Sequence, residues 1–272
     1  MRPRVGIAGS GLAGLACAAA LAPRADVLVF ERLPLVGGDH WEDERIRALT
    51  QQSKAEGASF FAGSHVLRWE NGSALVIGEH TGQVALDALV IATGHRPWTR
   101  AELGIEGPRL GGLLPATVAL HLLDFGVRFG ARPTVIGSSR WAFELVQRLP
   151  KPTIVVVPNG SAARLTASNG IEVFERARPM RVEGGPRVAA LLVELADGQR
   201  MTVETDGVLL AHGRIPYRNV EGAISACPRV VFAQPGEQAA DDEAVEAAGR
   251  AAAAEALRLV TLPATARIGG PT

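Results

Sequence analysis

Three glycines near the amino terminus have the spacing of a loop that binds phosphate groups. The motif Gly9-Ser10-Gly11-Leu12-Ala13-Gly14 fits G-x-G-x-x-G and joins two apolar stretches, residues 5–8 and 12–21. In a strand–turn–helix unit, the first glycine makes the tight turn, the second lets the backbone approach a pyrophosphate, and the third lets the helix pack on the strand. The helix N-terminus adds unpaired N–H groups and partial positive charge. The spacing therefore predicts a phosphate site.

The segments around this motif are the ones that would position it. Residues 5–8 are expected to form a short buried strand, residues 12–21 a helix, and residues 25–30 a second strand that ends at Glu31. Glu31 lies twenty residues after Gly11, where an acid can accept hydrogen bonds from an adenosine ribose. Strand, glycine motif, helix, strand and acid in this order predict a nucleotide-binding unit.

The same stretch has two other interpretations. Arg2 and Arg4 precede eighteen uncharged residues, 5–22, that end in small side chains, as in an export signal. A membrane helix would need about 20 predominantly apolar residues. Neither interpretation explains where the glycines lie. We therefore expect the nucleotide site, no membrane span and a cytoplasmic protein.

The composition excludes several classes of function. The 28 basic residues balance the 28 acidic ones, so no net charge attracts nucleic acid or anionic lipid, and no nucleic-acid partner is expected. Cys17 and Cys227 are the only cysteines and have no C-x-x-C spacing, which excludes a disulfide framework. An iron–sulfur cluster needs about four cysteine ligands. The six histidines show no i, i+4 pair on an expected helix, so no metal site is predicted.

The order of elements then recurs along the 272 residues. In the first half, strand-like runs between residues 64 and 86 lead to a buried strand that ends at Ala92-Thr93-Gly94. In the second half, a strand at 133–137, a helix at 141–149, a strand at 153–157, paired runs at 188–195 and 200–203, and a strand at 207–213 follow the same plan. This repeat predicts an α/β fold of two nested Rossmann-like domains. Each is expected to have three layers, two of β-strands and one of α-helices (ββα). One domain comprises residues 1–98 and 228–272, including a helix at 239–259, and the other is inserted at residues 99–227.

This architecture resembles the two-dinucleotide-binding flavoproteins, the group that contains thioredoxin reductases and the pyridine nucleotide-disulfide oxidoreductases. The resemblance covers nearly the whole chain and rests on the first motif with Glu31, on Gly37-Gly38, on Ala92-Thr93-Gly94 and on Gly213-Arg214-Ile215-Pro216. It implies FAD in the first domain and NAD(P)H in the inserted one, with hydride passing between nicotinamide and flavin. That step requires no general base, and the sequence shows no catalytic triad.

The resemblance also implies which residues contact the cofactors. Asp39 and His40 would line the flavin, although Asp39 has the alternative role of capping a helix that starts near Trp41. The residues assigned to FAD are Gly9, Ser10, Gly11, Leu12, Ala13, Gly14, Glu31, Arg32, Gly38, Asp39, His40, Ala92, Thr93, Gly94 and Gln234. The residues assigned to NAD(P)H are Gly137, Ser138, Ser139, Arg140, Trp141 and Gly213.

The chain departs from the family pattern at several positions. The redox-active C-x-x-C pair of the thioredoxin reductases is absent, which excludes disulfide reduction by the chain's own thiols. Ser139 replaces the middle glycine of the second turn, where a side chain obstructs a pyrophosphate. The strand at 153–157 ends without an acid for a ribose, although Arg164 could reach a 2′-phosphate. Gln234 stands near the position of the family's usual Gly-Asp pair.

Two functions are compatible with these residues. The first is an FAD oxidoreductase that exchanges hydride with NAD(P)H and passes electrons to a protein partner or another acceptor. The second is a non-catalytic or electron-relay subunit of a larger dehydrogenase, with a degenerate second nucleotide site. The intact first motif and the complete two-domain plan favour the first. Ser139, the missing acid after Val157 and the lost Gly-Asp pair favour the second. Residues 111–120 resemble the small flavin-containing subunits that accompany amino-acid, opine or glycerol-3-phosphate dehydrogenases.

Overall fold

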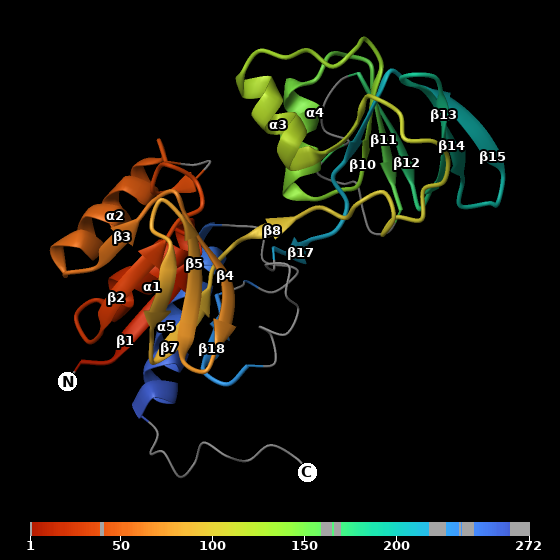
Figure 1. Cartoon of the computed structure of the whole chain (residues 1–272). Helices are drawn as coiled ribbons and strands as arrows, with labels where there is room; N and C mark the ends of the chain where they lie inside the picture. Colours follow the sequence, from red (N-terminus) through yellow and green to blue (C-terminus); the bar gives the residue numbers. More distant parts are fainter. Residues whose placement is uncertain are drawn as a thin grey trace, which may run out of the picture. The chain divides into compact units, whose positions relative to one another are not determined.

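The computed structural model describes residues 2–38, 41–158, 165, 170–217, 227–233, 235 and 242–261. The chain divides into two compact units, unit 1 with residues 1–94 and 216–272, and unit 2 with residues 95–215 (Figure 1). From the sequence, we expected the boundaries between the two units to come later in the chain, after residues 98 and 227. Two contacts explain the earlier positions: the ring of Trp98 packs edge-on against His212 of unit 2 at 4.9 Å, and Tyr217 N donates to Gly94 O in unit 1 at 2.8 Å.

Unit 1 is built on a parallel sheet of five strands in the order β18-β7-β1-β2-β3. After the exposed first residues of β1 and β2, Arg4 and Asp26, the central strands are uncharged and buried, as expected for strands that are covered on both faces. The motif follows β1 directly, and its helix α1 covers residues 12–21 as predicted. The bounds of the strands are β1 Arg4–Ala8, β2 Asp26–Phe30, β3 Ser59–Phe61, β7 Ala88–Ile91 and β18 Val230–Phe232.

The two faces of this sheet are covered differently, which gives the three layers (Figure 1). Helices α1 (Leu12–Leu21) and α5 (Asp242–Thr261) share one apolar cluster with Val5, Ile7 and Val29. The antiparallel strands β4 (Ser64–Glu70), β5 (Ser73–Gly78) and β6 (Gly82–Ala85) cover the other face through a second cluster. The ββα arrangement predicted from the order of elements is confirmed.

Small side chains let α5 lie close to α1. Gly249 of α5 faces α1 so closely that a Cβ atom there would lie less than 3.0 Å from the Ala13 carbonyl oxygen. The alanines at 252, 253 and 256 are buried in the same contact. The alanine-rich sequence of α5 therefore serves close helix packing, and the helix belongs to unit 1 as predicted.

Unit 2 repeats the plan with a parallel sheet in the order β12-β11-β10-β16-β9. Helices α3 and α4 share one apolar cluster with this sheet, and a three-stranded antiparallel sheet, β13-β14-β15, shares the other. The bounds are β9 Leu113–Pro115, α3 Ala116–Asp124, β10 Pro133–Ile136, α4 Arg140–Arg148, β11 Thr153–Val157, β12 Ile171–Glu175, β13 Arg178–Gly184, β14 Val188–Glu194, β15 Arg200–Glu204 and β16 Gly207–Leu210.

Several elements of unit 2 were not predicted from the sequence. Strand β13 carries arginines and a proline, and its pairing with β14 shifts register twice, so its alternation of apolar residues is weak. Strand β9 has only three residues and runs directly into α3. The two short linking strands β8 (His95–Arg96) and β17 (Ile215–Pro216) pair with each other where the chain enters and leaves unit 2.

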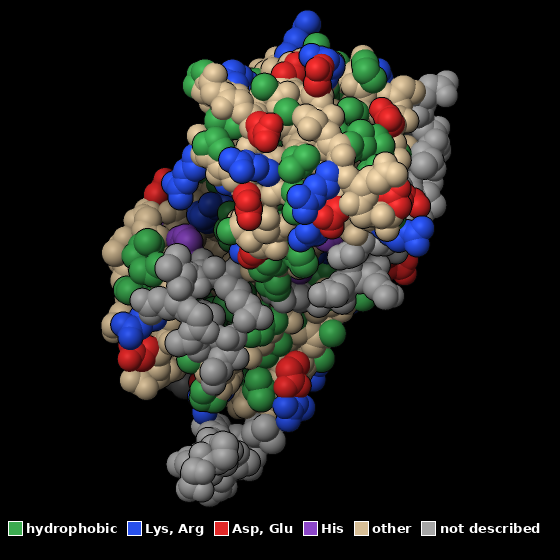
Figure 2. All heavy atoms as spheres, turned by 90° about the vertical axis from the view of Figure 1, so that its right-hand side faces the viewer, with side chains coloured by type: hydrophobic (Ala, Val, Ile, Leu, Met, Phe, Trp, Pro, Cys, Tyr) green, Lys and Arg blue, Asp and Glu red, His purple; other side chains and the backbone are tan. Residues whose placement is uncertain are grey.

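Acidic and basic side chains are interspersed on the face of the molecule in Figure 2, in keeping with the balanced composition. None of the described helices combines the length and the apolar character that crossing a membrane requires.

Candidate nucleotide-binding site

The three motif glycines fall into two classes by what surrounds them. Gly9 has a φ of +103°, and a Cβ atom there would lie less than 3.0 Å from the Ala92 carbonyl oxygen. A Cβ atom at Gly14 would lie equally close to the Gly9 carbonyl oxygen. The fold itself requires these two glycines. Gly11 differs, because nothing lies within 4 Å of the position its Cβ atom would take.

Gly11 is also the N-cap of α1, with an extended backbone that any residue can adopt (φ −69°, ψ −177°). No side chain caps this helix, and its first turn contains no acidic residue. The first N–H groups of a helix have no partner within the helix, and they carry its partial positive charge. Open space beside an uncapped helix N-terminus suits a bound anion such as a diphosphate.

Glu31 lies at this loop, as the sequence predicted, but the protein already engages it. Its side chain is buried, and Oε2 accepts hydrogen bonds from Ser10 N at 2.9 Å and Ser10 Oγ at 2.7 Å. Oε1 accepts one hydrogen bond, from Leu33 N at 2.8 Å. A carboxylate offers about four acceptor positions, so Oε1 retains capacity for a ribose hydroxyl.

The other residues assigned to FAD lie in the same unit. A Cβ atom at Gly38 would lie 4.0 Å from Glu31 Oε2, so the pair Gly37-Gly38 lies beside the first loop. Thr93 Oγ1 donates to the Tyr217 carbonyl oxygen, and the Arg32 guanidinium lies 6.0 Å from the centre of the Tyr217 ring. Asp39, His40 and Gln234 lie outside the described residues, as does Arg164.

The alternative role of Asp39 as a helix cap is wrong. Helix α2 (Glu44–Ala55) begins later than the sequence suggested, and Asp43 caps it by accepting a hydrogen bond from Arg45 N at 2.8 Å. An Asp two residues before Arg45 satisfies the helix N-terminus locally, so Asp39 is not needed there.

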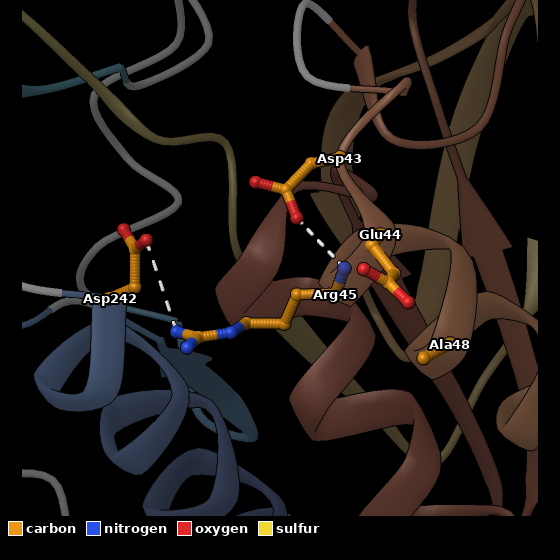
Figure 3. A pocket seen from close by; sticks show the side chains of 5 residues that line it. All are labelled: Asp43, Glu44, Arg45, Ala48 and Asp242. Atoms are coloured by element: carbon orange, nitrogen blue, oxygen red, sulfur yellow. Dashed lines mark hydrogen bonds and ion pairs between the residues drawn. The ribbon is translucent and has the colours of Figure 1, made fainter.

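A cavity of about 420 Å³ lies beside this cap (Figure 3). Its lining comprises Asp43, Glu44, Arg45, Ala48 and Asp242. The Arg45 guanidinium reaches Asp242 of α5 at 3.9 Å, so an ion pair ties the starts of α2 and α5 together. None of the residues predicted to bind a cofactor lines this cavity. Within the described residues, no group of three or more potential ligands could hold a metal ion.

The second turn, in unit 2, copies the backbone of the first. Gly137 has a φ of +123°, and a Cβ atom there would lie less than 3.0 Å from the Ala211 carbonyl oxygen. Ser139 is the N-cap of α4, and its backbone angles of −71° and 173° nearly match those of Gly11. Its side chain donates a hydrogen bond to the Ala211 carbonyl oxygen at 2.6 Å. The serine thus fills, with its own side chain, a position that is open in the first turn.

Cationic side chains surround this second turn. Burial, followed by the charge of Arg140, lowers the pKa of Arg214. Burial, followed by the charge of Arg214, lowers the pKa of His95. Arg140 begins α4, so the two guanidinium groups and the helix N-terminus act at one end of the unit 2 sheet. Sequence reasoning assigned Arg140 to this site and missed His95, which no local motif marks.

Gly213, the last predicted residue of this site, is required by packing. Its φ is +67°, and a Cβ atom there would lie less than 3.0 Å from the indole nitrogen of Trp98. Burial lowers the pKa of the neighbouring His212. Gly213 therefore lets the chain pass against an aromatic ring as it leaves β16. Ser138 and Trp141 are half-buried.

Comparison with known proteins gives the fold. The family model of NAD(P)-binding Rossmann-like domains matches residues 7–68. The thioredoxin reductase of Lactococcus lactis, in its FR conformation, has a TM-score of 0.67 at 15% identity, over 95% of this chain and 99% of that chain. The chain has the fold of a thioredoxin reductase. The predicted fold class, two nested Rossmann-like domains, is thereby confirmed.

Two further solved structures share this fold. A pyridine nucleotide-disulfide family oxidoreductase from Enterococcus faecalis V583 has a TM-score of 0.67 at 16% identity, over 93% of this chain and 68% of that one. A NAD-dependent persulfide reductase from A. fulgidus has a TM-score of 0.64 at 16% identity, over 92% of this chain. The match spans only 58% of the persulfide reductase. No curated protein matches the sequence.

Proposed function

We propose that the chain is an FAD-dependent oxidoreductase that exchanges hydride with NAD(P)H. The observation that carries the proposal is Gly11, the one motif glycine that the fold does not require. Open space at its Cβ position, an uncapped helix and the nearby Glu31 fit the adenosine diphosphate part of a dinucleotide. The fold shared with a thioredoxin reductase supports FAD as the dinucleotide held in unit 1.

Each part of the loop has a separate task in this proposal. The amides at the start of α1 bind the diphosphate, and Glu31 accepts a hydrogen bond from the ribose. Ala92, Thr93 and Gly94 follow β7 at the end of the sheet where β1 enters the loop, so they border the extended cofactor. FAD, when bound, supplies the hydride-accepting ring, and the protein supplies position and electrostatics. The guanidinium groups of Arg140 and Arg214 in unit 2 favour the phosphates of a pyridine nucleotide.

The electrons must leave by a route other than the chain's own thiols. Cys17 is fully buried in unit 1, and burial raises the pKa of its thiol to about 12. A thiol with that pKa is not a nucleophile near neutral pH. Cys227 has no cysteine partner at C-x-x-C spacing. The proposal therefore requires a separate electron acceptor, such as a partner subunit or a small molecule that reaches the flavin.

One observation favours the second function, an electron-relay subunit that does not bind NAD(P)H. Ser139 occupies the position of the glycine that approaches a pyrophosphate, and its hydroxyl donates a hydrogen bond to the carbonyl oxygen of Ala211, the residue after β16. In addition, β11 ends at Val157 and Pro158 follows, so the strand itself is not followed by an acid for a ribose. In this version FAD stays in unit 1 while unit 2 serves as a scaffold for a larger dehydrogenase.

A single preparation distinguishes the two functions. The purified chain, loaded with FAD, is titrated without oxygen first with NADH and then with NADPH, while its visible spectrum is recorded. Bleaching of the flavin absorbance by either nucleotide supports the oxidoreductase. A yellow protein that neither nucleotide bleaches supports the relay subunit. A protein that takes up no FAD contradicts both, and Gly11→Val serves as the control for non-specific flavin.

A further inference from the structure

Ser10 links the first glycine loop to two other segments, the acid after β2 and the glycine pair at residues 37–38. Its side chain is fully buried, and both its backbone N–H and its hydroxyl donate to the same oxygen of Glu31, at 2.9 and 2.7 Å. The hydroxyl oxygen also accepts a hydrogen bond from Gly37 N at 2.8 Å. One residue of the G-x-G turn thereby contacts the acid after β2 and the glycine pair beyond it.

The direction of these bonds follows from their chemistry. A backbone N–H group can only donate a hydrogen bond, so Ser10 Oγ must accept the one from Gly37 N. The single hydroxyl proton is then free to donate only to Glu31. Glu31 Oε2 receives both of its hydrogen bonds from Ser10, whereas Oε1 receives one from Leu33 N. Ser10 therefore occupies one carboxylate oxygen and leaves the other with acceptor capacity.

Gly37 gives this network a fixed point. Its φ is +100°, and a Cβ atom there would lie less than 3.0 Å from Ile46 Cγ2 of α2. Ile46 is buried, so packing holds the Gly37 backbone in place. The hydrogen bond from Gly37 to Ser10 thus ties the carboxylate, through the serine, to a packed helix.

We propose that Ser10 is a positioning residue that sets Glu31 for recognition of the ribose of an adenine nucleotide. The inference rests on the proposed function, because it assumes that the first loop binds adenosine diphosphate. Without the hydroxyl, Glu31 loses one of its three hydrogen bonds and its link to Gly37. The carboxylate then samples other orientations, and its contact with a ribose hydroxyl weakens.

The test compares ADP with its 2′-deoxy and 3′-deoxy analogues, each titrated into the FAD-free full chain by calorimetry. The wild-type chain is expected to prefer ADP over at least one analogue by roughly ten- to a hundredfold, the value of a hydrogen bond to a charged group. In Ser10→Ala this preference falls to about threefold or less. Ser53→Ala is the matched control, since Ser53 is also fully buried in unit 1 but bonds to Leu49 O within α2. It keeps the wild-type preference.

Two results would overturn the inference alone. They are a Ser10→Ala chain that binds all three ligands more weakly with an unchanged preference, and a Ser10→Ala chain unchanged in every affinity. A wild-type chain that binds ADP and both analogues equally would overturn the inference together with the ribose contact assigned to Glu31. Ser10→Gly removes the same hydroxyl and replaces Ser10→Ala if the latter does not fold. Loss of folding in both variants, with Ser53→Ala folded, would assign Ser10 a purely structural role. A wild-type chain that binds neither ADP nor FAD would instead refute the proposed function.

Discussion

Replacing Gly11 with valine should weaken FAD binding strongly while changing the stability of the apoprotein little. Nothing lies within 4 Å of the added Cβ, and a φ of −69° suits any residue. The change should cost the apoprotein no more than about 1 kcal/mol through the helix N-cap. For a domain of 150 to 250 residues this is a fall of about 2 to 4 °C in Tm.

Cofactor binding should suffer far more than stability does. The valine side chain would occupy the space beside the first amides of α1, where the diphosphate is expected. Losing two hydrogen bonds to a charged group costs about 3 to 6 kcal/mol, which is roughly a hundred- to ten-thousand-fold in FAD affinity. Flavin absorbance after gel filtration gives the occupancy, and fluorescence quenching on titration of apoprotein gives the affinity.

Gly14→Ala provides the opposite case in the same motif. Its Cβ would lie less than 3.0 Å from the Gly9 carbonyl oxygen, so the backbone must shift. Such overpacking costs typically about 1 to 3 kcal/mol. The Tm of the apoprotein should fall clearly in Gly14→Ala and hardly in Gly11→Val. Wild-type FAD content in Gly11→Val, or equal losses of stability in the two variants, would refute the reasoning.

Three further predictions concern unit 2. Ser139→Gly should raise the affinity for NADH or NADPH about tenfold, the value of one recovered bond to a charged group, and unchanged calorimetric affinities would count against obstruction by the serine. Gly213→Ala should lose about 1 to 3 kcal/mol in denaturant unfolding, more than Gly198→Ala, because both have positive φ but only the first would collide with an indole ring. Because the pKa of His95 is lowered, its contribution to folding stability is fully present above pH 6.5, the ordinary pKa of histidine, and is lost as the pH falls below that value. Arg214→Gln should lessen the fall in Tm between about pH 7.5 and pH 5, and an unchanged slope would contradict the coupling.

The first half of the fold could be predicted because its signals are local. A glycine motif between two uncharged runs fixes β1, the turn and α1 within a few residues, and the helix at 12–21 has the predicted bounds. The recurrence of this order predicted unit 2 and its layers. Glu31 was placed at the loop by spacing alone, since β1 and β2 pair in register beside each other.

Other features depend on contacts between segments that are far apart in the chain. The role of Ser10 requires residues 21 and 27 positions away to meet in space, and nothing in the sequence marks a serine between two glycines for that task. Strand β13 was missed because its arginines obscure the alternation. Helix α2 begins at Glu44, because the residue that caps it, Asp43, lies in the loop directly before the helix and not at the glycine pair.

The central claim is that the backbone amides at the start of α1 hold the diphosphate of FAD. A crystal structure of the chain soaked with FAD tests it most directly. The account predicts electron density for the diphosphate against the amides of Leu12, Ala13 and Gly14, with the adenosine ribose beside Glu31. An empty loop in crystals that bind FAD elsewhere, or density in which the adenosine lies away from Glu31, would contradict it.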